Sequence, residues 1–460
     1  MGGGGKPHPP AGHRVDRPQS ECGRGGGLGP GRPRRTEETR MTETNDPSRR
    51  RFLTGALAAG GAVAATRVAA QAVPDPAITE VQPWAQYLGA GVDAAPYGMP
   101  SKHEAHVVRR NVEWLTADTV SSINFTPLHE LDGIITPNGV CFERHHSGVA
   151  EVDPGEYRLM INGLVDTPLV FTLEDLKRFP RENHAYFLEC AANTGMEWRG
   201  AQLNGCQFTH GMIHNVMYTG VPLRLLLEEA GVKSSAAWVL PEGADAAAMT
   251  RSVPLAKALD DCLVAFKMNG EALRPEQGYP VRLVVPGWEG NMWVKWLRRI
   301  EIGDQPWHHR EETSKYTDLL HDGRARRFTW EMDAKSVITN PSPQAPILHG
   351  PGPTVLTGLA WSGRGTIPRV DVTLDGGANW HQARMSGPSL DKSLHRFYYE
   401  FDWDGGPLLL QSRAHDSTGY VQPTKDMLRE VRGENSIYHN NGIQTWAVNE
   451  NGEAENVEVS

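Results

Sequence analysis

Cysteine is scarce in this chain, and no two of its five cysteines have the CxxC spacing of a zinc site or a redox dithiol. Long apolar runs are missing as well. The stretch from Leu57 to Ala70 is rich in Ala and Gly, is interrupted by Arg67, and falls short of the ~20 apolar residues that a membrane span needs. No internal repeat is present. The sequence therefore gives no sign of a zinc or dithiol site, a membrane protein or a repeat protein.

The composition favours a folded protein that is rich in β-structure. Charged residues make up 22% of the chain, which argues against disorder of its main body. The 460 residues are enough for two or three domains. With 49 glycines, 33 prolines and strand-like runs between the turns, a β-rich globular protein fits better than a helical one.

The N-terminal region differs from the rest. Residues 1–40 combine Gly runs with scattered Arg and Pro, so we predict an extension that is disordered or untranslated, with Met41 as the better start. The sequence SRRRFL at 48–53 then precedes the apolar stretch, which ends in the small-x-small site Ala70-Gln71-Ala72. This pattern predicts a twin-arginine signal over 41–72 and export to the periplasm. Because that route carries folded proteins, it favours a protein that receives a cofactor before export.

The mature chain is acidic. Removal of residues 1–72 takes away 12 of the 46 basic and 6 of the 55 acidic residues, which leaves a formal charge of −15. Such a surface argues against nucleic acid as a partner. It suits a basic partner, such as a c-type cytochrome, through electrostatic steering, although solubility alone explains it equally well.

Strand and turn signals alternate with short helix signals over residues 73–335, which we take as the first large domain. Its N-terminal part, residues 73–135, is rich in turns and is expected to wrap around the rest. We predict strands near 140–142, 157–161, 186–188, 238–240, 263–268 and 281–285, and helices near 172–180, 222–230 and 254–259.

A second domain is predicted over residues 336–448, followed by a tail at 449–460. Five prolines between Ser336 and Pro353 indicate a stiff linker or edge. Beyond it, alternating runs near 370–374, 397–401 and 408–414 and a turn at Asp375-Gly376-Gly377 are typical of short strands without helices. This region reads as an immunoglobulin-like β-sandwich. The fold class predicted is α+β, with a mixed β-rich domain before the sandwich.

Cys190 is the most suggestive cysteine. It follows Tyr186, Phe187 and Leu188, which read as the end of a buried strand, and it precedes a run of small residues up to Gly195. A thiol in that place can face a bulky cofactor. The alternative is that Cys190 is simply a small buried side chain, as most free cysteines are.

Buried positive charge is the second suggestive feature. Arg282 stands in the apolar run PVRLVVPG, where a bare charge is costly, so we expect it to point at an anion or a carboxylate. Lys295, Arg298 and Arg299 follow, interleaved with tryptophans, a combination that suits a phosphate or pterin ligand. For Arg298 and Arg299 a basic surface strip is an equally good interpretation.

Histidine pairs give weaker signals. Three pairs occur: His145 with His146, His308 with His309, and His210 with His214. Adjacent residues of a strand point to opposite faces, so the first two pairs are not expected to bind one metal ion. The third pair could share a helical face, but no Glu lies between the two histidines as a metalloprotease site requires.

Several motifs, in order along the chain, carry a resemblance to a known family. FERHH, LECAAN, MNGEALRPEQGYPVRLVVPG and VKWLRRIEI together resemble the sulfite oxidase family of molybdopterin enzymes, from about Gly133 to Val448. Within that family, GMEWRGAQLNGCQFTHGM, REETSKYTD and RGENSIYHNNGIQTW look like the molybdenum subunits of periplasmic sulfane dehydrogenases. The resemblance implies a molybdopterin-binding domain followed by an immunoglobulin-like dimerisation domain.

The resemblance also implies roles for individual residues. The molybdenum ligand falls on Cys190, and the other catalytic residues on Arg144, Tyr316 and, for the substrate anion, Arg432. The residues implied to bind the cofactor are Phe142, Arg144, His146, Asp245, Arg282 and Lys295. Two positions depart from the family pattern: Gln277 stands where sulfite oxidases have His, and Gly195 where they have an anion-binding Arg.

The implied activity is molybdenum-dependent oxidation of a sulfur substrate by oxygen-atom transfer. The missing Arg at position 195 favours protein-bound sulfane sulfur, delivered by a sulfur-carrier protein, over free sulfite as the alternative substrate. No cytochrome b5 stretch and no heme are expected in this chain, so electrons would pass to a separate c-type cytochrome. A homodimer through the C-terminal domain and a heteromer with the cytochrome are implied. A cofactor-free periplasmic binding protein is the alternative from another class.

Overall fold

The computed structural model describes residues 101–111, 122–202 and 204–459. All of them belong to one unit, residues 91–460. The predicted extension at 1–40, the predicted signal at 41–72 and most of the turn-rich stretch at 73–135 lie outside the described residues. Among those described, no helix is both long and apolar enough to cross a membrane.

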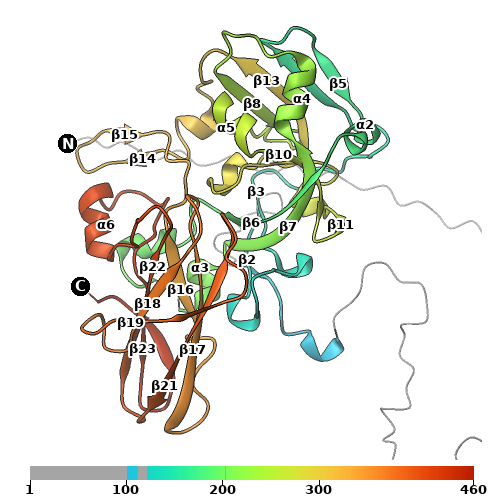
Figure 1. Ribbon diagram of the computed structural model, residues 1–460. Helices are drawn as coiled ribbons and strands as arrows, with labels where there is room; N and C mark the ends of the chain where they lie inside the picture. Colours follow the sequence, from blue (N-terminus) through green and yellow to red (C-terminus); the bar gives the residue numbers. More distant parts are fainter. Residues whose placement is uncertain (1–100, 112–121, 203, 460) are drawn as a thin grey trace, which may run out of the picture. The chain divides into compact units, whose positions relative to one another are not determined.

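Two sheets build the first half of the described chain (Figure 1). One has the strand order β11-β10-β7-β6, with β12 paired to β10, and the other has the order β5-β4-β13-β8-β9. Their strands are β4 (Leu159–Gly163), β5 (Leu169–Phe171), β6 (Glu182–Glu189), β7 (Ile213–Pro222), β8 (Trp238–Gly243), β9 (Val253–Pro254), β10 (Leu263–Met268), β11 (Glu271–Ala272), β12 (Arg282–Val284) and β13 (Leu297–Gly303).

Short helices and small strands complete this half. The helices are α2 (Leu173–Arg178), α3 (Cys206–His210), α4 (Leu223–Ala230) and α5 (Leu255–Asp260), with 3-10 turns that include η7 (Asn138–Val140) and η8 (Gly195–Arg199). A small sheet joins β1 (Arg110–Asn111), β2 (Ser122–Phe125) and β3 (Arg144–His145), and a hairpin joins β14 (Asp318–Leu319) and β15 (Ala325–Arg326).

Local sequence signals placed most of these elements. Thr172 and Asp175 cap each other's backbone at the start of α2, as the predicted helix start requires. Gly231 ends α4 in the left-handed conformation, with φ of 69°. The predicted strand at 140–142 is wrong, because Asn138–Val140 form a 3-10 turn and residues 141–143 are irregular.

The second half is a β-sandwich, which confirms the predicted fold class. One sheet has the order β16-β17-β21-β20, and the other has the order β19-β18-β22-β23-β24. The strands are β16 (Lys335–Asn340), β17 (Gly352–Trp361), β18 (Arg369–Thr373), β19 (His381–Gln382), β20 (Arg384–Ser386), β21 (His395–Trp403), β22 (Leu408–His415), β23 (Thr445–Val448) and β24 (Ala454–Val457). Large buried side chains such as Trp361, Phe397 and Trp446 fill its core.

Three details of the sandwich sharpen or correct the prediction. Residues 336–340, which open the stretch predicted as a stiff linker or edge, belong to β16, an edge strand of its sheet, because the prolines begin only at Pro341. The helix α6 (Lys425–Arg432) was not predicted, since its sequence KDMLREVR buries little apolar surface. The predicted tail contains β24, which pairs with β23.

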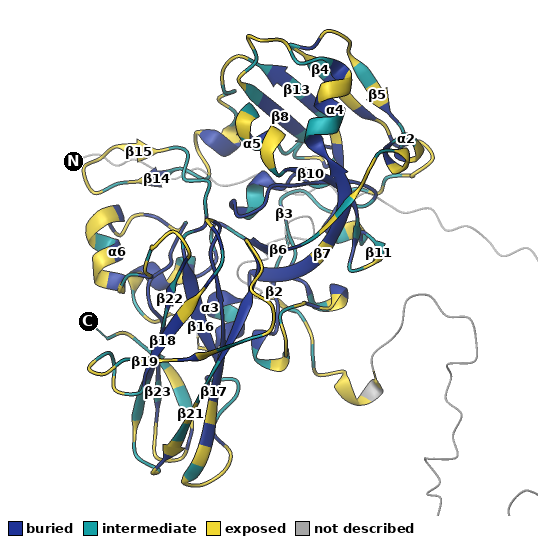
Figure 2. Ribbon diagram, in the orientation of Figure 1, coloured by how far each residue is buried: buried dark blue, intermediate teal, exposed yellow. Residues whose placement is uncertain are grey.

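The strand β6 lies between the two halves. Phe187 packs in the cluster that forms the sandwich core, whereas its neighbour Leu188 packs in the core of the first half. Successive side chains of a strand point to opposite faces, so β6 contributes to both cores. Figure 2 shows β7 as a largely buried ribbon at this boundary, whereas β6 is buried mainly in its C-terminal half. Cys190 follows β6 directly and is therefore anchored from both sides.

Candidate active site

A cavity opens in the first half of the chain. It collects side chains from segments far apart in the sequence, between residues 142 and 316. Eight of the nine residues that the sequence analysis assigned to the site line it: Phe142, Arg144, His146, Cys190, Asp245, Arg282, Lys295 and Tyr316. The arrangement brings a thiol, several basic groups and a phenol to one space.

Cys190 is held by its backbone at the end of β6. Its N–H donates to the carbonyl of Met212, at 3.0 Å, and its carbonyl accepts from the N–H of Asn193, at 2.9 Å. Cys190 is half-buried, whereas the other cysteines that the structure describes are buried, and all four are free thiols. Burial raises the pKa of the Cys190 thiol, and Arg144 acts against that shift.

Arg282 is a buried cation without a carboxylate. Its side chain is 2% exposed and donates to the carbonyls of Gln277 and Trp293, at 3.2 and 3.1 Å, and to the Gln277 side chain, at 3.4 Å. The rings of Tyr218 and Trp293 flank it. Its Nε has no hydrogen-bond partner within the described part of the chain. The expected carboxylate is thus absent there, and an anion in the cavity remains the expected partner.

Lys295 is likewise a cation without a carboxylate partner among the described residues. Its ammonium group donates to the carbonyls of Arg144, at 3.1 Å, and Glu276, at 2.9 Å, and lies over the Trp296 ring. Burial, with the nearby Arg282 as the next cause, lowers the pKa of Lys295 to about 7. Protonated Lys295 is therefore poised to gain from an anionic ligand.

The segment from Phe142 to His146 forms one wall of the cavity. Gln277 donates to the carbonyl of Phe142, at 2.9 Å, so the residue that departs from the family pattern ties this wall to Arg282. Both histidines of the segment line the cavity. Burial and the surrounding cations lower the pKa of His145 to about 4 and that of His146 to about 3. The cavity thus has a strongly positive field that keeps both rings neutral.

Asp245 lies just beyond β8. Its carboxylate accepts a hydrogen bond from the backbone N–H of Met249, at 3.1 Å, and its side chain is largely buried. Asp245 is therefore an acidic group in a lining that is otherwise mainly basic and aromatic.

Tyr316 adopts the left-handed conformation, with φ of 52°, which is uncommon for a residue other than glycine. Its hydroxyl lies 3.0 Å from Nε2 of His146, and its ring packs against Tyr438, with 5.2 Å between the ring centres. The guanidinium of Arg251 lies over the same ring, at 5.3 Å. Tyr316 is thus fixed from three sides while it faces the cavity.

Sequence reasoning missed the buried network behind Tyr316. Arg251 pairs with Glu289, at 3.2 Å, and donates to Asn291, while His439 lies 3.2 Å from Glu289. Glu312 lies 3.9 Å from the Arg251 guanidinium. These residues come from separate segments, and no local motif connects them. Only their mutual burial identifies them as a unit.

Arg432 is not part of the cavity lining. It ends α6, is 5% exposed, and pairs with Asp318 at 3.4 Å and Asp333 at 3.5 Å. The sequence analysis assigned it to the substrate anion, but the structure shows its charge already matched by two carboxylates.

His210 and His214 do not share a helical face, and the low expectation for this pair as a metal site remains. His210 ends α3, whereas His214 stands in β7, where it lies 3.1 Å from the hydroxyl of Tyr218. His308 contacts Arg327 and His309 contacts Thr250. No group of three or more His, Cys, Asp or Glu side chains that could hold a metal ion occurs among the described residues.

Gly195 departs from the family pattern for a steric reason. A Cβ atom at this position would collide with the carbonyl oxygen of Ile437. The chain beyond α6 therefore passes where a side chain at position 195 would begin. An arginine cannot be accommodated there unless that segment moves.

The residues of the cavity fit a molybdopterin. One half-buried thiol supplies a single soft ligand, which is sufficient where the pterin contributes the other sulfur ligands. Arg282 is a buried cation and Lys295 a half-buried one; neither forms an ion pair with a carboxylate within the described part of the chain, and Arg282 retains an unpartnered Nε. The phosphate of such a cofactor would supply the missing negative charge.

Comparisons with known proteins agree with this site. Residues 146–311 match the family described as oxidoreductase molybdopterin binding domain, and residues 326–446 match the Mo-co oxidoreductase dimerisation domain. The crystal structure of the sulfane dehydrogenase SoxCD from Paracoccus pantotrophus is similar, with 65% identity and a TM-score of 0.82, over 84% of this chain and 100% of that chain.

Curated relatives include sulfite oxidases and, at 30% identity, nitrate reductases. The Gallus gallus enzyme is 32% identical over 338 residues, covering 67% of this chain and 73% of that protein. The mitochondrial enzyme of Mus musculus is 35% identical over 290 residues, covering 57% of this chain and 52% of that protein, so the chain spans about half the length of this relative. The fold and site define a molybdopterin oxidoreductase. The chain belongs to the sulfite oxidase family.

Proposed function

We propose that this chain is a molybdenum-dependent dehydrogenase that oxidises protein-bound sulfane sulfur. The observation that carries the proposal is the cavity in which Cys190 faces buried, uncompensated cations. Similarity to a sulfane dehydrogenase over the whole of that solved chain supports the choice of substrate class. When bound, the molybdenum cofactor supplies two-electron oxygen-atom transfer to sulfur.

The chain's own residues would bind the metal and would bind and orient the rest of the cofactor. The Cys190 thiolate would hold the metal. Arg282 and Lys295 would bind the anionic part of the cofactor, while His146 and Asp245 would orient it and Phe142 would close its wall. The family resemblance implies these assignments, and the position of the side chains in the cavity lining supports them.

The substrate would meet Arg144 and Tyr316. The Arg144 guanidinium would stabilise negative charge that develops on the sulfur group. Tyr316 would donate a hydrogen bond from its hydroxyl, whose partner in the structure is the neutral His146 ring. Arg432, matched by two carboxylates, would act by holding α6 in place rather than by binding the substrate.

The substrate proposal also rests on Gly195. With no arginine at this position, free sulfite would lose one of its anion-binding groups. Neutral sulfane sulfur carried on another protein depends less on such a group. The collision that a side chain would have with Ile437 gives this departure a structural basis.

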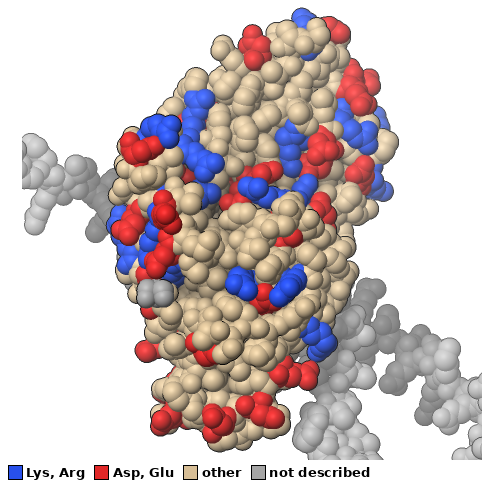
Figure 3. Space-filling view, turned by 60° about the vertical axis from the view of Figure 1, so that its left-hand side comes forward, with Lys and Arg blue, Asp and Glu red and all other residues tan. Residues whose placement is uncertain are grey.

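The proposed setting is the periplasm, after twin-arginine export. There the chain would form a homodimer through the sandwich and would deliver electrons to a c-type cytochrome subunit. Acidic side chains gather over the sandwich end of the molecule in Figure 3, a distribution that suits a basic partner. A sulfur-carrier protein would bring the substrate.

Free sulfite is the second candidate substrate, because the Gallus gallus relative, which is 32% identical, is named sulfite oxidase. One assay separates the two. The purified chain is tested for molybdenum, then for reduction of cytochrome c with sulfite alone and with a carrier protein that bears sulfane sulfur. We expect bound molybdenum and turnover with the carrier only. Fast turnover with free sulfite at a micromolar KM would overturn the sulfane proposal, and a folded chain without molybdenum would favour a binding protein.

A further inference from the structure

The segment that contains Cys190 is held by contacts with the sandwich domain. We define the cysteine loop as residues 189–199, from the last residue of β6 to the end of η8. Two of its carboxylates, Glu189 and Glu197, are completely buried. Each is bound by a lysine of the sandwich half, Glu189 by Lys335 and Glu197 by Lys425.

The first contact lies directly beside the cysteine. Lys335 donates to Oε1 of Glu189, at 2.9 Å, and the indole N–H of Trp361 donates to Oε2, at 2.7 Å. Lys335 and Trp361 are direct partners across β16 and β17, so both donors project from one face of that sheet. Both oxygens of the carboxylate that precedes Cys190 are thereby fixed by the sandwich.

The same contact extends into the loop. Asn193 donates to Oε1 of Glu189, at 2.9 Å, and its side-chain oxygen accepts from the N–H of Met212, at 3.1 Å. Met212 is also the residue whose carbonyl holds the N–H of Cys190. Lys335 reaches the carbonyl of Asn193 as well, at 3.4 Å. The Lys335 ammonium group therefore contacts residues on both sides of Cys190 in the sequence.

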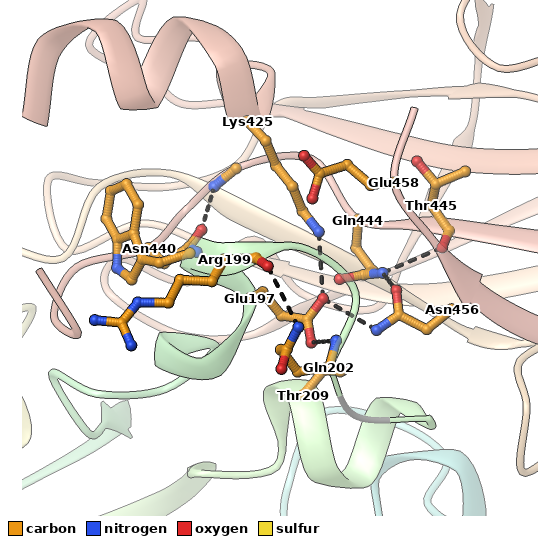
Figure 4. Close-up of polar contacts among 12 residues, drawn as sticks. Glu197, Arg199, Gln202, Thr209, Lys425, Asn440, Gln444, Thr445, Asn456 and Glu458 are labelled. Atoms are coloured by element: carbon orange, nitrogen blue, oxygen red, sulfur yellow. Dashed lines mark hydrogen bonds and ion pairs between the residues drawn. The ribbon is translucent and has the colours of Figure 1, made fainter. Parts of the chain in front are cut away.

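The second contact holds the far end of the loop. Figure 4 shows Glu197 with Lys425 and Asn456 reaching it from the sandwich half, at 3.3 and 3.0 Å from Oε2. The N–H of Gln202 donates to Oε1, at 3.1 Å. Arg429 of α6 also donates to the carbonyl of Trp198, at 3.3 Å. Both ends of the loop thus depend on sandwich residues.

We propose that the sandwich domain positions the metal-binding thiol, with Glu189, Lys335 and Trp361 as positioning residues for Cys190 and with the Glu197–Lys425 pair as a second support. The inference rests on the proposed role of Cys190 as the metal ligand. A buried ion pair is weak evidence for stability, because desolvation offsets the attraction. Its placement on the cysteine loop, at both ends, is better explained by the need to fix one thiol.

The test measures how accessible Cys190 is, so it needs neither metal nor turnover. The full chain is produced without cofactor, and alkylation of each cysteine by iodoacetamide is followed by mass spectrometry under native conditions. Lys335→Met should increase the rate at Cys190 by about tenfold while the buried Cys262, which reports global unfolding, stays unmodified, because the loop opens locally. Trp361→Phe, which keeps the ring and loses one donor, should give a smaller preferential increase.

Asp371→Asn is the matched control. Asp371 is buried in the sandwich and binds Arg413, at 3.1 Å, and His415, at 2.8 Å, without touching the cysteine loop. This variant should lower stability and leave the rate of alkylation at Cys190 unchanged while Cys262 stays unmodified. If Lys335→Met does not fold, alkylation of Cys190 in Trp361→Phe decides whether the sandwich positions the thiol.

A rate of alkylation at Cys190 that stays at the wild-type value in Trp361→Phe, or in both variants, would overturn the positioning role. Failure of the proposed function would look different. In that case Cys190→Ala would retain molybdenum, whatever the alkylation rates are.

Discussion

The cavity and the boundary with the sandwich both bury cations, but they treat them differently. Arg282 and Lys295 at the cavity are met by carbonyl oxygens and aromatic rings, with no carboxylate within ion-pair distance among the described residues. Lys335, Lys425 and Arg432 at the boundary each have carboxylate partners.

This difference distinguishes cations that are available to bind a ligand from cations that are paired within the protein and hold its structure. A buried charge without a counter-charge costs free energy, and it persists in a folded chain where something else repays that cost. At the cavity the remaining partner is an anionic ligand. At the boundary the charges are complete within the protein, so they fix geometry. Each of the following variants changes a residue either at the cavity or at the boundary with the sandwich.

Cys190→Ala should have the largest effect. The substitution removes the proposed metal ligand and little volume, so turnover and bound molybdenum should be lost. The free energy of unfolding of the cofactor-free chain should change by only about 1 kcal/mol or less, because no charge or hydrogen-bonded group is left unmatched. Metal analysis and urea unfolding measure the two quantities. Retained molybdenum with normal turnover would remove Cys190 from the site.

Arg282→Met and Lys335→Met should differ in the cofactor-free chain. Lys335→Met strands the buried Glu189 carboxylate and should cost about 3–5 kcal/mol. Arg282→Met removes a charge without an ion-pair partner but leaves two buried carbonyls without their donor, so it should cost less, about 1–2 kcal/mol, while the affinity for the cofactor falls by about 10–100-fold. Urea unfolding and cofactor reconstitution measure these effects.

Equal losses of stability in the two variants would break the comparison. In that case the carbonyl contacts of Arg282 would be structural, and the cavity would not be prepared for an anion. Arg298→Met is a useful control, since Arg298 is half-exposed and pairs with Glu242 at 2.7 Å on the surface. It should cost at most about 1 kcal/mol and leave cofactor affinity unchanged.

The fold was predictable where local patterns match the final packing. The cap at Thr172, the stop at Gly231 and the alternation in β18 and β22 each reflect the position that the segment occupies. The helix α6 has local signals that were missed, because the Thr424 side chain caps the N–H of Met427 and Gly433 follows the helix with φ of 74°. The partners of Lys425, Arg429 and Arg432 in distant segments are not encoded by any local pattern.

The site was predictable in its members more than in their arrangement. An apolar run around Arg282 marks a buried charge, and family resemblance indicates which residues to consider. The pairing of Arg251 with Glu289, and of Lys335 with Glu189, joins residues 38 and 146 positions apart. Burial of both members is the only signal, and it appears only after folding. Arg432 illustrates the limit, because its two carboxylates were not foreseeable from the sequence.

The smallest effect concerns Lys295 and pH. Burial lowers its pKa to about 7 in the folded chain, against 10.5 as the ordinary value. Between these values the unfolded chain binds the extra proton, so the stability of the cofactor-free chain should rise with pH through this window. Lys295→Met should lack this rise, and the difference between the two chains in urea unfolding isolates it. Bound cofactor should flatten the rise in the native chain, because an anion favours charged Lys295. A rise of the same size with and without cofactor would mean that no anion reaches this lysine.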